Sequence, residues 1–130
     1  MNRVYLVFFF LIGFALASNA QADMSFKEVS HDFGQVKAGK DTLWYNFTFT
    51  NTGNEPLQIN DVKTSCDCTL AEWPKGPIQP GKSAVVRGGF KLENKSGSFV
   101  KSVIITANTA PATTILTIKG DIVQDGSSPQ

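Results

Sequence analysis

The sequence contains few residues that commonly carry out catalysis. Its 130 residues include one histidine, two cysteines and two methionines. A hydrolase triad would have to use that histidine, His31, and no Gly-x-Ser-x-Gly element accompanies it. The carboxylates are scattered around turns, where solvated acidic residues are usual. We therefore predict that the chain is not an enzyme and has no catalytic residues, and we interpret His31 as a polar residue at a strand end.

An excess of charge of one sign is also absent. The 12 lysines and arginines nearly balance the 11 aspartates and glutamates, and the basic residues form no run. Proteins that bind nucleic acid carry a basic field or stripe, which this chain lacks. A basic amphipathic helix, the usual means of binding a membrane surface, is also missing from the pattern. These observations exclude nucleic acid as the expected partner.

Long hydrophobic runs are absent except at the N-terminus. Arg3 precedes an apolar run over residues 4–17, and Ala20-Gln21-Ala22 is a small-x-small cleavage pattern. The run of 14 residues is shorter than the roughly 20 that span a bilayer. We predict that residues 1–22 are a signal peptide cleaved after Ala22, with no stable membrane insertion afterwards. The product is expected to be periplasmic or extracellular.

Alternation of apolar and polar residues predicts strands in most of the remaining chain. The clearest segment is residues 43–50, and others lie at 24–29, 57–62, 70–73, 84–92, 99–105 and 113–123. Val100 and Ile104 indicate burial on both faces of one strand. The prolines of residues 74–81 predict a surface loop. About seven short strands without a convincing helix predict a single all-β domain, an immunoglobulin-like antiparallel β-sandwich over residues 23–124, followed by a disordered tail at 125–130.

The two cysteines, Cys66 and Cys68, are separated by one residue. In a regular strand their Cα atoms would lie about 6.6 Å apart, near the upper limit of about 6.8 Å for disulfides, so bonding requires a bend at Asp67. Three interpretations remain open, namely a structural disulfide, a redox-active dithiol and a two-thiolate Cu(I) site. Zinc would need two further ligands, and none is evident. We expect a Cys66–Cys68 disulfide in the isolated protein, without a metal or cofactor.

An ordered series of motifs extends over nearly all of the predicted domain. It comprises Asp32-Phe33-Gly34, Asn51-Thr52-Gly53, Pro56-Leu57, Cys66-Asp67-Cys68-Thr69, Pro77-Ile78 with Pro80-Gly81, and Leu116 and Ile118 with Gly120. This series resembles the bacterial family catalogued as domain of unknown function 1573, related to the Hydin and major-sperm-protein group. The resemblance implies a secreted sandwich that binds partners or has a structural role, with no assigned catalytic residues. This chain carries Asp67 where the family usually has glycine.

The composition, the pattern and the resemblance together predict an exported, non-catalytic binding or scaffold module of the bacterial cell envelope. We expect it to contact a protein partner through its loops or a sheet edge, because immunoglobulin-like domains present both. The alternative function is a thiol–disulfide or Cu(I)-handling protein that uses Cys66 and Cys68.

Overall fold

Eight strands make up most of residues 21–124, which are the residues that the computed structural model describes. Within this range no helix is present. The predicted signal segment up to residue 20 and the predicted tail at 125–130 lie outside the described residues. The strands are β1 (Met24–Phe26), β2 (Ser30–Lys37), β3 (Thr42–Asn51), β4 (Ile59–Thr64), β5 (Thr69–Glu72), β6 (Ser83–Lys91), β7 (Gly97–Ala107) and β8 (Thr113–Val123).

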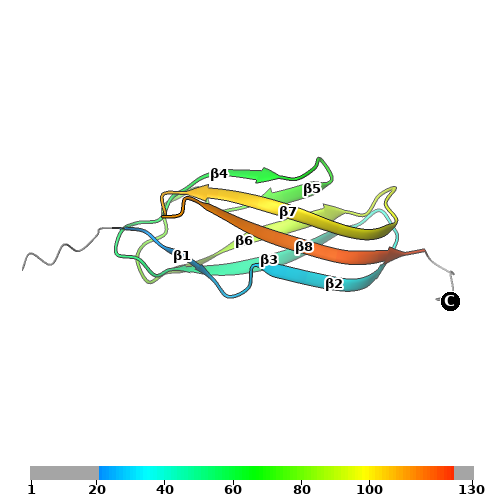
Figure 1. The fold of residues 1–130 in the computed structure, drawn as a ribbon, viewed down its shortest axis with the longest axis horizontal. Coiled ribbons are helices and arrows are strands. Elements are labelled where there is room, and N and C mark those ends of the chain that lie inside the picture. The colour runs from blue at the N-terminus through cyan, green and yellow to red at the C-terminus, as the bar shows by residue number, and fades with distance from the viewer. Residues whose placement is uncertain (1–20, 125–130) are drawn as a thin grey trace, which may run out of the picture.

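The strands form two four-stranded sheets that pack face to face (Figure 1). One sheet has the order β1-β3-β6-β5 and the other has the order β2-β8-β7-β4. The predicted all-β sandwich is confirmed. Two details differ from the expectation. Residues 21–124 contain eight strands rather than about seven, and β2 pairs with β8 in parallel whereas the other strand pairs in this range are antiparallel.

The core lies between the two sheets because alternate residues of each strand face inward. Phe47 and Phe49 of β3 and Phe90 of β6 are at most 1 % exposed, and they lie in one cluster with Leu116 and Ile118 of β8. The opposite face of each sheet is turned outward. The expectation that β7 is buried on both faces is wrong, since Val100 is 66 % exposed. Its sheet is covered on one side only.

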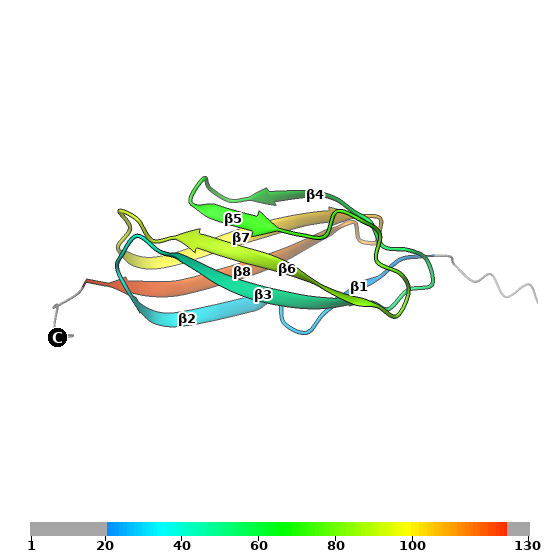
Figure 2. The same ribbon diagram turned by 180° about the vertical axis from the view of Figure 1, so that it is seen from behind.

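The chain changes sheet between β1 and β2. After β1 ends at Phe26, the chain leaves β3 and pairs with β8 of the other sheet, as Figure 2 shows. The sequence did not predict β2, because His31, Asp32 and Gly34 interrupt its alternation. Gly34 adopts a φ of 66° at a bulge, where its N–H donates to Asp32 Oδ1 at 2.8 Å. A positive φ is accessible to glycine at little cost.

Candidate functional site

The Cys66–Cys68 pair lies in the connection between β4 and β5. Thr69 N–H donates to the Cys66 carbonyl at 3.1 Å, which closes a turn over residues 66–69. The turn brings the two Cα atoms to 5.3 Å, and the sulfurs are bonded to each other. The bend that the spacing required is therefore present. Asp67 makes it without a positive φ, so the turn does not need the glycine usual at this position.

The disulfide is half-buried at one end of the sandwich. Cys66 Sγ lies 3.4 Å from Thr69 Oγ1, and Thr69 is buried, with only 3 % of its surface exposed. Cys68 packs against the hydrophobic core, and the Asp67 between the cysteines is exposed. One side of the bond is thus held by the fold while the tip of the turn faces solvent.

The other chemistry-bearing residues stay apart from the cysteines. His31 stacks on the ring of Tyr45, with centroids 3.6 Å apart and planes at 5°, and it meets Phe33 edge to face. It therefore belongs to an aromatic cluster between β2 and β3. In the described part of the chain, no three His, Cys, Asp or Glu side chains gather as ligands for a metal ion.

No helix long and apolar enough to cross a bilayer occurs between residues 21 and 124.

The sheet edges differ in how well they are protected against pairing with another chain. The edge strands β2 and β4 each carry an extra residue that shifts the register, between Asp32 and Gln35 and between Ile59 and Asp61. The edge strand β5 has only four residues. Bulges and short length are the usual means by which proteins make an edge unfit for pairing with another strand.

The outer edge of β3 has neither protection. β3 pairs with β6 from Thr42 to Thr50 without a register shift, whereas β1 covers only Phe49–Asn51 on the other side. Among the described strands, none pairs with this edge over residues 42–48. This open edge of β3 is a regular stretch of extended backbone. Sequence reasoning did not locate it, because an open edge is a property of strand pairing.

The backbone groups that face the open edge follow from the alternation of an antiparallel ladder. Lys27 N–H donates to the Thr48 carbonyl at 3.2 Å, just beyond the end of β1. Every second residue of β3 points its N–H and C=O to the same side as Thr48, so Asn46 and Trp44 continue that row. Asn46, in the middle of this row, is an exposed residue.

Polar and charged groups border the open edge of β3. A small hollow of about 110 Å³ lies beside it, and it is lined by Lys27, Glu28, Tyr45, Asn46, Phe47 and Thr48.

On the outward face of the sheet, the Trp44 ring lies over Gly89, where a Cβ would come within 2.7 Å of the ring. The Arg87 guanidinium lies 4.5 Å from the centroid of the same ring. The Trp44 ring is thereby held against the outward face of β6.

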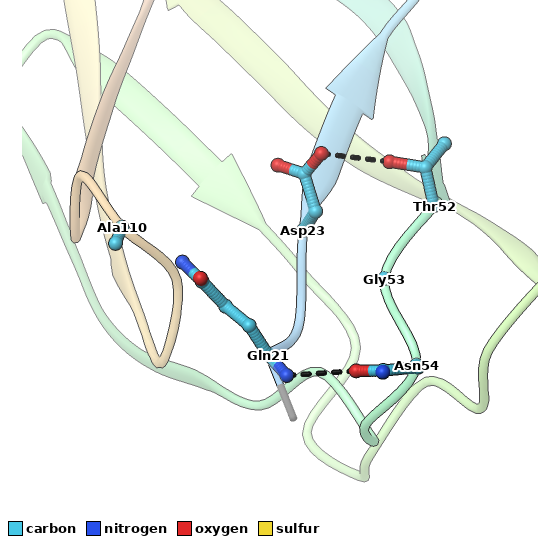
Figure 3. A pocket seen from close by; sticks show the side chains of 6 residues that line it. All are labelled: Gln21, Asp23, Thr52, Gly53, Asn54 and Ala110. Atoms are coloured by element: carbon cyan, nitrogen blue, oxygen red, sulfur yellow. Dashed lines mark hydrogen bonds between the residues drawn. The ribbon is translucent and has the colours of Figure 1, made fainter. Parts of the chain in front are cut away.

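A second hollow lies at the opposite end of the sandwich from the cysteines. It measures about 470 Å³ and is lined by Gln21, Asp23, Thr52, Gly53, Asn54 and Ala110 (Figure 3). Thr52 Oγ1 donates to Asp23 Oδ2 at 2.9 Å and Gln21 N donates to Asn54 Oδ1 at 2.8 Å. These two hydrogen bonds join the segment that precedes β1 to the segment that follows β3.

The two packed sheets, with a chain that passes from one to the other after β1, define an immunoglobulin-like β-sandwich. The chain belongs to the DUF1573 family, whose model is described as a protein of unknown function and matches residues 24–122. The resemblance seen in the sequence is thus confirmed. No curated protein sequence matches this chain.

Solved structures with the same fold come from diverse proteins. A protein of unknown function from Porphyromonas gingivalis W83 has a TM-score of 0.68 at 21% identity, covering 82% of this chain and 50% of that one. The secreted serine protease VesC from Vibrio cholerae has a TM-score of 0.60 at 18% identity, covering 82% of this chain and 24% of the protease. The chain therefore spans half or less of the length of these two proteins.

A PapD-like domain of human CEP192 is similar over most of its own length. Its TM-score is 0.64 at 10% identity, with coverage of 81% of this chain and 88% of that domain. At such identities the likeness concerns the fold alone.

Proposed function

We propose that this chain is an exported, non-catalytic binding module of the bacterial cell envelope that takes an extended segment of a protein partner as an added strand on the open edge of β3. The observation that carries the proposal is the contrast between edges. β2 and β4 are bulged and β5 is short, whereas β3 is regular and has no described strand paired to its outer edge over residues 42–48. An added strand would gain backbone hydrogen bonds without altering the sandwich.

The surroundings of the open edge of β3 favour a peptide as the ligand over a small molecule. The adjoining hollow is small, about 110 Å³, so it offers a side-chain pocket rather than a site for a whole ligand. Trp44 and Arg87 present a flat, partly apolar surface on the outward face of the same strand pair. Main-chain bonding at the edge would supply affinity, and these side chains would supply selectivity.

The test uses a displayed random-peptide library as the probe and two variants of Asn46. In Asn46→Pro the edge loses one backbone donor that pairs with no strand, whereas Asn46→Ala keeps that donor and removes only the side chain. We expect selected peptides to bind Asn46→Pro about tenfold more weakly, because the loss of one or two hydrogen bonds costs about that much binding free energy. Asn46→Ala should bind them nearly as well as the wild type. Unchanged binding to Asn46→Pro would contradict the proposal.

The cysteine turn supports a second candidate function, thiol–disulfide exchange or Cu(I) handling through Cys66 and Cys68. The observation in its favour is that the turn brings both sulfurs together beside solvent. A double Cys66→Ser, Cys68→Ser variant separates the two functions. Peptide binding that survives this variant supports the edge, whereas Cu(I) uptake by the reduced protein that the variant abolishes supports the cysteine site.

A further inference from the structure

The residues just before β1 form part of the sandwich. Ala22 is 1 % exposed, belongs to the core cluster and makes a parallel bridge with Thr109. Gln21 exchanges two hydrogen bonds with Asn54. Its N–H donates to Asn54 Oδ1 at 2.8 Å (Figure 3), and its carbonyl accepts from Asn54 N–H at 3.0 Å. The folded unit therefore begins no later than Gln21.

Gly53 shows how closely the backbone of residues 21–23 packs against the segment that follows β3. A Cβ at Gly53 would collide with the Gln21 carbonyl oxygen and would lie 2.9 Å from Ala22 C and 2.7 Å from Asp23 N. All three of these atoms belong to backbone, which cannot turn aside as a flexible side chain can. The absence of a side chain at residue 53 thus makes room for residues 21–23.

Cleavage after Ala22 would dismantle this arrangement. It would remove Ala22 from the core and remove both hydrogen bonds between Gln21 and Asn54. The fold therefore disfavours the chain that such cleavage would leave.

The sequence offers a second small-x-small pattern two residues earlier, Ser18-Asn19-Ala20. We propose that the exported protein is processed between Ala20 and Gln21, an inference that rests on the export included in the proposed function. Hydrolysis by the export peptidase adds water across the Ala20–Gln21 bond and gives a carboxylate on Ala20 and an ammonium on Gln21. That ammonium still donates to Asn54 Oδ1, and it lies in the same hollow as the Asp23 carboxylate.

The direct test is expression of the full chain in a bacterium that exports it, followed by intact mass measurement and N-terminal sequencing. The expected first residue is Gln21, in the free form or with the mass lowered by loss of ammonia on cyclisation. A protein that begins at Asp23, or at Ser18 after the pattern Ala15-Leu16-Ala17, would overturn the inference and leave the proposed binding function intact. A protein that keeps Met1 would overturn both the inference and the proposed export.

The physical reason is tested with recombinant chains that begin at Gln21 and at Asp23. We expect the chain that begins at Asp23 to melt at least about 4 °C lower, and peptide binding at the distant β3 edge provides a control for its integrity. Gly53→Ala is the matched variant. It should lower the Tm of the longer chain more than that of the shorter one, since two of the three obstructing groups are then absent. Equal melting temperatures of the two chains would refute the claim that residues 21 and 22 stabilise the folded domain.

Discussion

Tyr45 shows how one side chain closes the side of the sandwich where the chain changes sheet. Its ring stacks on His31 of β2, and its hydroxyl donates to Glu28 Oε2 at 2.6 Å. The pKa of Tyr45 is raised above its ordinary value, first because Glu28 accepts that hydrogen bond, and then because of partial desolvation and the negative charge of Glu28. Glu28 and Tyr45 thus connect the β1–β2 crossover to β3.

The titration of Tyr45 provides a test at the scale of the residue. Tyr5 and Tyr45 are the two tyrosines of the sequence, so tyrosinate absorbance of a chain that begins at Gln21 reports Tyr45 alone. We expect its midpoint to lie above 10.0 and to fall toward that value in Glu28→Ala. Because the folded-state pKa is raised, the stabilisation is present below about pH 10 and is lost as the pH rises through the folded-state pKa. Equal midpoints in both proteins would contradict this assignment.

At the scale of the element, the cysteine turn is held by more than its disulfide. Ser65 N–H donates to the Ser102 carbonyl at 3.1 Å, and Ser102 N–H donates to Ser65 Oγ at 3.0 Å, so the start of the turn is bonded to β7. Thr69 N–H closes the turn on the Cys66 carbonyl. The connection between β4 and β5 therefore has its own network of hydrogen bonds.

We predict that reduction, or the double Cys66→Ser, Cys68→Ser variant, leaves the sandwich folded at 25 °C. Closing a loop of three residues restricts the unfolded chain by only about 1.5 kcal/mol, against the roughly 5–15 kcal/mol that a domain possesses. The Tm should fall by no more than roughly 6–12 °C. Thermal melting followed by far-UV circular dichroism, with and without reductant, measures the effect. Loss of the cooperative transition on reduction would show that the disulfide holds the fold together.

At the scale of the whole molecule, stability comes from one core between two sheets. Large side chains from both sheets are buried there. They include Phe47, Phe49 and Phe90 of one sheet and Leu116 and Ile118 of the other. The outward faces contribute little burial, as the 66 % exposure of Val100 shows. A small domain of this kind depends on a few large apolar residues.

Phe47→Ala should therefore lower the free energy of unfolding by about 3–5 kcal/mol, because it removes buried surface and leaves a cavity. Val100→Ala is the matched control on the outward face of β7, and we expect it to change stability by less than about 0.5 kcal/mol. Denaturant unfolding of the two variants and the wild type gives both values. A small loss in Phe47→Ala would mean that the sheets can collapse around the missing ring.

The sequence alone determined which residues form most strands and which of their faces is apolar, since alternation is local to the chain. β3, β6, β7 and β8 could be predicted in this way, as could the bend at Asp67, because the spacing of Cys66 and Cys68 demands it. β2 could not, because its bulge at Gly34 breaks the alternation.

Tertiary structure decided which strands became neighbours. Strand pairing depends on contacts between residues distant in sequence. The parallel β2–β8 pair, the open edge of β3 over residues 42–48 and the half-buried setting of the cysteine turn therefore had no local signal. Ala22 is the clearest case. Its sequence neighbours fit a cleavage pattern, yet packing against the end of β3 and the bridge to Thr109 make it part of the core.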